Sequence, residues 1–147
     1  MIYEKFIVML KATVLSLIVI PLVLAIDLNS PFQHFSFENY LQYFLFFAII
    51  GTLLMFVFGF PTTMLAGVIT EKLTGKIRFF VNVIFHILIA ASIGYILFNE
   101  TYLFIVLTIL VATIVIVFDE VKRLKKPTHK VILSLSPILL FFLLYSL

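Results

Sequence analysis

The chain has 147 residues, the length of one ordinary domain, yet 64% of them are hydrophobic and only 12% are charged. Soluble globular domains are about 45–50% apolar and about 25% charged, so a soluble fold could not bury this much apolar surface. The composition predicts an integral membrane protein. The chain contains no cysteine, which excludes disulfides, thiolate metal sites and cysteine nucleophiles.

The chain has several long apolar stretches that could cross a bilayer. A helical crossing needs roughly 20 mostly apolar residues. Helices are expected because an open strand in lipid would leave its backbone hydrogen bonds unmade. The sequence therefore predicts an all-α membrane protein, a single domain made of a bundle of about five transmembrane helices. The predicted spans are residues 6–26, 40–60, 79–98, 101–118 and 131–147.

The first span contains one charged residue, Lys11. Its long side chain can carry the ammonium back to the headgroups, so we expect it to lie at the membrane surface. The alternative is that this segment is a signal peptide, because a basic N-terminus precedes it and Val23-Leu24-Ala25 resembles a cleavage site. Signal cores are usually only 7–15 residues long, which favours a true span.

The connection after the first span contains helix-starting signals. Ser30-Pro31-Phe32-Gln33 is a capping-box pattern and predicts a short interfacial helix. Ser36 is a candidate cap for the second span.

The segment after the second span has two interpretations. Pro61 should end or kink the second helix, because proline lacks a backbone donor and clashes with the preceding turn. Residues 61–74 could then form an amphipathic helix on the inner membrane surface, ended by Gly75. Alternatively, the second span is one long kinked helix whose end carries Glu71 and Lys72.

Only Asn99 and Glu100 separate the third and fourth spans, so these two helices should form an antiparallel hairpin through a tight turn. Residues 119–126 are expected to continue the fourth helix for two turns until Pro127, with Asp119 near Lys122 and Arg123. Pro137 predicts a kink in the fifth span.

The basic residues predict the orientation in the membrane. All 10 lysines and arginines lie at the N-terminus or in the second and fourth connections. Cytoplasmic loops carry the excess of these residues, so the N-terminus should be cytoplasmic and, with five spans, the C-terminus outside.

The third span contains the candidate intramembrane polar site, Asn82 and His86. Together with Ala90 and Gly94 they recur every four residues, so they form one stripe of polar and small side chains that should pack inward. A structural contact between helices is the simpler interpretation of His86, and a role in moving a proton or a substrate is the alternative.

No catalytic or cofactor-binding residues are expected, since the chain lacks a Walker loop, an HExxH pair, a G-x-S-x-G elbow and paired intramembrane carboxylates. We therefore expect no enzyme and no cofactor. Asp27, His34 and Glu38 share one loop but form no ligand motif, so no metal site is predicted. A basic cluster in the fourth connection is too small for nucleic acid and is a candidate contact for anionic lipid. It comprises Lys122, Arg123, Lys125, Lys126 and Lys130.

The stretch from Phe58-Gly59-Phe60-Pro61 through Ile69-Thr70-Glu71-Lys72-Leu73, followed by a span with a histidine, resembles small uncharacterised multi-pass membrane proteins of Gram-positive bacteria. The resemblance implies a plasma-membrane location and no particular activity. The chain is also similar in size to small transporter halves, but it lacks the intramembrane glutamate of small multidrug exporters.

These observations favour a non-enzymatic protein that acts by association, as an accessory subunit of other membrane proteins or as a homo-oligomer in contact with membrane lipids. The alternative is a small oligomeric transporter or channel with Asn82 and His86 on its pathway. An immunity or stress-response role is a third hypothesis that the sequence does not separate from the first.

Overall fold

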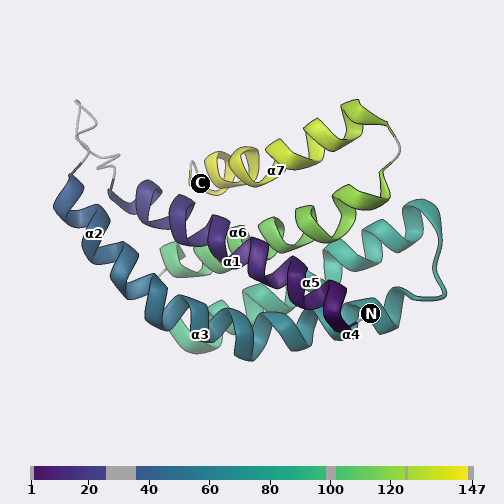
Figure 1. Cartoon of the computed structure of the whole chain (residues 1–147), viewed down its shortest axis with the longest axis horizontal. Coiled ribbons are helices and arrows are strands. Elements are labelled where there is room, and N and C mark those ends of the chain that lie inside the picture. Colours follow the sequence, from purple (N-terminus) through teal and green to yellow (C-terminus); the bar gives the residue numbers. More distant parts are fainter. Residues whose placement is uncertain (1, 26–35, 99–101, 125, 146–147) are drawn as a thin grey trace.

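A computed structural model describes residues 2–25, 36–98, 102–124 and 126–145, and every element in these ranges is helical (Figure 1). Four helical segments are long and apolar enough to cross a membrane. They are α1 (Ile2–Ala25), the continuous segment Phe37–Thr70, α5 (Gly75–Phe98) and α6 (Tyr102–Glu120). The prediction of an all-α membrane protein is confirmed at this level.

The segment Phe37–Thr70, called the long helix below, is built from five consecutive pieces. Ser36 caps its start, because its hydroxyl accepts a hydrogen bond from the backbone N–H of Asn39 at 3.3 Å. This prediction is confirmed. The interfacial helix expected at residue 30 lies outside the described residues. The pieces are α2 (Phe37–Phe46), the π-helix η1 (Phe47–Gly51), α3 (Thr52–Leu54), the π-helix η2 (Met55–Gly59) and α4 (Phe60–Thr70).

The long helix passes through Pro61 without a break, so the continuous helix is observed and not a separate helix after a break. Pro61 lies in the first turn of α4, directly after η2. The wider π turn supplies the space that the proline ring needs against the preceding turn. Gly75 begins α5 with a φ of 58°, a left-handed conformation that glycine adopts without strain.

The expected hairpin of α5 and α6 is confirmed by contacts along the pair. Phe98 stacks on Phe104 with ring centroids 4.8 Å apart, next to the connection. One helical turn before Phe98, Gly94 lies so close to Ile105 and Thr108 that a Cβ atom would be 3.1 Å from the Ile105 Cα. The four buried residues of α5 are those of the predicted stripe, so the inward packing of this face is also confirmed: Asn82, His86, Ala90 and Gly94.

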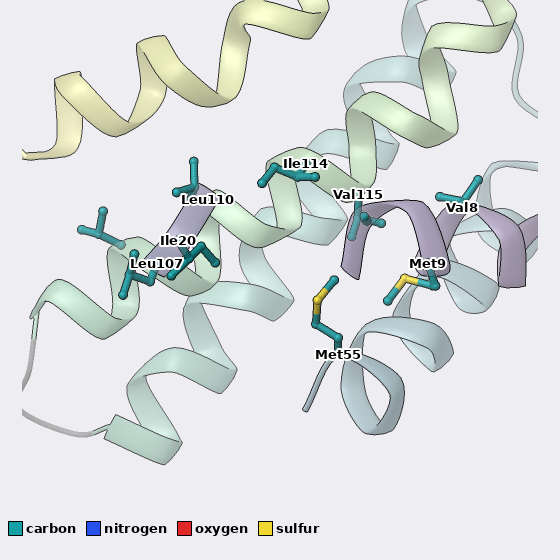
Figure 2. Close-up of a cluster of buried hydrophobic side chains, with 10 residues drawn as sticks. Val8, Met9, Ile20, Met55, Leu107, Leu110, Ile114 and Val115 are labelled. Carbon is teal, nitrogen blue, oxygen red and sulfur yellow. The ribbon is translucent and has the colours of Figure 1, made fainter. Parts of the chain in front are cut away.

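The apolar core lies where α1 and α6 cross the long helix (Figure 2). Met9 of α1 and Met55 of η2 point toward each other and toward α6. Gly59 permits this approach, because a Cβ there would be 2.8 Å from the Met9 terminal methyl. Of an 18-residue apolar stretch in each segment, 56% is buried in α6 and 6% in the long helix, so α6 is central and the apolar part of the long helix is peripheral. The α6 residues of the core are Val106, Leu107, Leu110, Ile114 and Val115.

The end of α6 and the start of the last helix, predicted at residues 126 and 131, both differ from prediction. Helix α6 ends at Glu120, followed by the 3-10 turn η3 (Val121–Arg123) and extended Leu124, so it does not run on to residue 126. Helix α7 (Pro127–Tyr145) begins at Pro127 and carries Pro137 in its interior. Asp119 and Glu120, the last two residues of α6, bind basic partners on other helices, as described next.

Candidate functional site

The ends of four helices meet on one side of the bundle. Because successive helices run in opposite directions, the N-terminal ends of α1 and α5 lie beside the C-terminal ends of α4 and α6 (Figure 1). At this end of the bundle, five buried or nearly buried residues are joined by ion pairs and side-chain hydrogen bonds, and we call them the charged cluster. They are Lys5, Arg78, Asn82, Asp119 and Glu120.

The first ion pair of the charged cluster joins α1 to α6. The Lys5 ammonium donates to the Asp119 carboxylate at 2.6 Å, and the two side chains are only 6% and 4% exposed. Helix α4 makes room for the lysine with Gly67, where a Cβ would be 3.2 Å from the Lys5 Cε. Three helices therefore meet at this single lysine.

The second ion pair joins α5 to α6. The Arg78 guanidinium donates to the Glu120 carboxylate at 3.1 Å, with side chains 14% and 4% exposed. Each charge in the two pairs lies at the unfavourable end of its own helix dipole, since acids are disfavoured at C-termini and bases at N-termini. The antiparallel packing offsets this, because it places the acids of one helix against the bases of its neighbours.

Asn82 links the two ion pairs. Its side-chain amide donates to the Asp119 carboxylate at 3.3 Å and to the Glu120 carboxylate at 2.6 Å, and the residue is fully buried. The opposite amide orientation would place its carbonyl oxygen against two carboxylates, so the charges fix this one. The Asn82 Oδ1 atom has no hydrogen-bond partner within the described part of the chain.

His86 lies one helical turn beyond Asn82 and is 3% exposed. Its Nδ1 atom is 2.9 Å from the backbone carbonyl oxygen of Asn82, in its own helix. Its Nε2 atom is 3.5 Å from the Thr63 hydroxyl of α4, a long separation for a hydrogen bond. His86 therefore contacts another helix only weakly.

A cavity of about 130 Å³ lies between α1, the long helix, α5 and α6. His86 and Thr63 line it, whereas Asn82 does not. The halves of the long helix and α5 that lie farther from the charged cluster line the cavity, through Ile50 and Leu54 of the long helix and Ile93 of α5. The cavity thus begins next to the charged cluster and runs toward the opposite end of the bundle.

The cavity wall is apolar apart from His86 and a few hydroxyl groups. Three of these hydroxyls, on Thr13, Thr62 and Thr108, donate their single proton to carbonyl oxygens of their own helices, so toward a ligand they can only accept. The hydroxyls of Ser16 and Thr52 are different, because neither finds a partner among the residues that the structure describes. The site thus combines an apolar wall with a small number of unpaired polar atoms.

The sequence identified Asn82 and His86 but assigned them one shared role. The structure separates them: Asn82 belongs to the charged cluster and His86 to the cavity. Sequence reasoning missed Lys5, Arg78 and Glu120, and it paired Asp119 with Lys122 and Arg123. The structure shows Asp119 bound to Lys5, 114 residues away, while the Lys122 side chain lies outside what is described and Arg123 is exposed. The available signal was two acids at a helix C-terminus, where the helix dipole disfavours them.

The remaining candidates lie apart from this site. Asp27 and His34 are outside the described residues, and Glu38 is exposed. Within the described ranges, no group of three or more His, Cys, Asp or Glu residues could hold a metal ion. In the basic connection, Arg123, Lys126 and Lys130 are exposed, while Lys125 and the Lys122 side chain lie outside what is described. The anionic-lipid contact stays a prediction.

Comparisons of the chain with protein-family models, with curated proteins and with solved structures found no match.

Proposed function

We propose that the chain is a small plasma-membrane transporter for uncharged apolar molecules, with the cavity as its pathway and the charged cluster as its cytoplasmic gate. The observation that carries this proposal is the position of the cavity, which ends at His86 and Thr63, one helical turn from Asn82. A pathway that stops at a set of separable ion pairs has the parts of a gate. The sequence placed both Asn82 and His86 on the pathway of a transporter. In the present proposal, only His86 of these two residues lines the pathway, and Asn82 belongs to the gate.

The distribution of basic residues supports a cytoplasmic position for the charged cluster. Lys5 and Lys76 lie at this end of α1 and α5, Lys72 lies in the turn after α4, and the basic connection follows α6. In the proposed topology α7 is a fifth span and the C-terminus is outside. A reporter fused after Leu147 tests this, because a cytoplasmic signal there would mean that α7 does not cross.

The absence of native cysteine allows a direct test of the gate. Thr63→Cys places one thiol at the inner end of the cavity, where the native side chain is fully buried. We expect a charged thiol reagent, added from the cytoplasmic side of vesicles, to label it slowly. Adding Lys5→Met and Asp119→Leu should raise the labelling rate several-fold, because the α1 to α6 tie is then lost.

The matched control for this experiment is Lys11→Met in the same Thr63→Cys background. Lys11 is an exposed lysine on the same helix, outside the charged cluster. Its removal should leave the labelling rate unchanged. Equal labelling with and without the Lys5 and Asp119 side chains would show that the cluster is not a gate. In addition, His86→Ala should abolish substrate movement at normal membrane levels.

A second candidate function is association with other membrane proteins or with copies of itself. It is favoured by the long helix, because only 6% of an 18-residue apolar stretch of this helix is buried, which leaves most of that apolar surface for lipid or for a partner. Mild crosslinking in native membranes followed by affinity purification and mass spectrometry tests it. A stoichiometric foreign protein would indicate an accessory subunit, and crosslinked copies of the chain alone would indicate an oligomer.

A further inference from the structure

The hydrogen bonds around His86 leave one ring nitrogen without a donor. A backbone carbonyl oxygen can only accept, so the Nδ1 atom, 2.9 Å from the Asn82 carbonyl oxygen, must carry the proton. In the neutral ring the Nε2 atom is then a bare acceptor. Its nearest polar neighbour is the Thr63 hydroxyl at 3.5 Å.

Thr63 does not satisfy that acceptor. A threonine hydroxyl has one proton, and Thr63 donates it to the Gly59 carbonyl oxygen at the short distance of 2.8 Å. The Thr63 oxygen and the His86 Nε2 atom therefore face each other as two acceptors. This leaves a buried nitrogen lone pair at the wall of an otherwise apolar cavity.

A doubly protonated His86 would remove this mismatch but would create an unbalanced charge. The neighbouring cations Lys5 and Arg78 are already paired one to one with Asp119 and Glu120. An imidazolium would be a third buried cation with no carboxylate of its own, and unpaired buried charge is costly. The neutral ring with a free Nε2 acceptor is the form that the surrounding charges support.

The size and lining of the cavity define the rest of the ligand. An apolar cavity of about 150 Å³ in another protein stays dry and binds molecules of the size of benzene. The present cavity has a similar volume, about 130 Å³, and extends along α5 from His86 to Leu97, which is about 16 Å at the rise of a helix. An elongated apolar body fits this shape better than a compact one.

We infer that the cavity binds an uncharged amphiphile, an alkyl or acyl chain with one terminal O–H group that donates a hydrogen bond to His86 Nε2. This inference rests on the proposed function in that it names the substrate class of the same cavity. Alcohols and protonated carboxylic acids with alkyl chains of about six carbons share the required chemistry and match the cavity volume. Ser16 and Thr52, further along the cavity, offer hydroxyls to a ligand that carries a second oxygen.

The test compares two photoreactive probes on the purified full chain in detergent: a diazirine-bearing hexanol and its methyl ether. The ether keeps the chain and the oxygen but has lost the donor. A net hydrogen bond of about 0.5–1.5 kcal/mol corresponds to about a 2- to 12-fold preference for the alcohol. We expect this preference in labelling of the α5 and α6 peptides. Equal labelling of the unaltered protein by both probes would overturn the inference.

Two variants locate the interaction. His86→Phe keeps an aromatic ring but no acceptor, so the alcohol preference should vanish while labelling by the ether persists. Ala90→Phe should fill the cavity and abolish labelling by both probes. A preference that survives in His86→Phe, or labelling that survives in Ala90→Phe, would contradict the assignment.

The binding test does not depend on transport. The probes could show the expected preference while Thr63→Cys labels at the same rate with and without the Lys5 and Asp119 side chains. That result would support the binding site and refute the transporter. If the alcohol is not preferred over the ether but the Thr63→Cys labelling rate rises as expected when the ion pair is removed, only the proposed ligand class is refuted.

Discussion

Breaking the Lys5 to Asp119 ion pair from one side should destabilise the protein far more than removing both partners together. The two side chains are 2.6 Å apart and no more than 6% exposed, so neither charge can reach water if its partner is lost. In Lys5→Met the Asp119 carboxylate keeps only the Asn82 amide, at 3.3 Å. In Asp119→Leu the Lys5 ammonium loses its carboxylate.

The expected magnitude follows from the burial of this pair. Removing one partner of a buried ion pair costs about 3–5 kcal/mol, whereas replacing both by apolar residues of similar volume is often neutral. For a chain of this size, 1 kcal/mol shifts the melting temperature by about 2–4 °C, so each single variant should melt roughly 6–20 °C lower. The double variant should melt close to the unaltered protein.

The assay is thermal unfolding of the purified variants in one detergent, followed by circular dichroism, with the four members of the double-mutant cycle compared. Lys11→Met is the control, because an exposed lysine should change stability by less than about 0.5 kcal/mol. If the cost of the double variant equals the sum of the two single costs, the residues are not coupled and the electrostatic reasoning is refuted.

Three further predictions use the same unfolding assay or amide exchange. Gly94→Leu should lower the free energy of unfolding by at least about 1–3 kcal/mol, because a side chain there collides with Ile105 and Thr108. Ser92→Leu on the exposed face should be tolerated. Equal stability of the two variants would contradict the close packing. Asn82→Asp should be less stable than Asn82→Leu at neutral pH, since it adds a third carboxylate beside Asp119 and Glu120, and the reverse order would disprove the bridging role. Ser36→Ala should cost about 0.5–2 kcal/mol and speed amide exchange in the first turn of α2, and unchanged exchange would show that the cap is not formed.

Local properties of the chain predicted most of the helices. Apolar length locates the spans because each crossing must satisfy its own backbone in lipid. The four-residue spacing from Asn82 to Gly94 identified the buried face of α5, because polar residues avoid lipid and small residues let neighbouring helices approach closely. Ser36 marked the start of the long helix through a contact only three residues away. Each of these inferences depends on neighbours within one helix.

Tertiary structure alone decided the charged cluster and the cavity. Lys5 and Asp119 pair across 114 residues, and no pattern within one helix specifies such a partner. The same packing separates Asn82 from His86, although the sequence places them on one face, because α6 meets the first residue and the cavity meets the second. The cavity itself exists because the long helix and α5 contact each other at α4, while their halves farther from the charged cluster line an open space. How whole helices cross decides this.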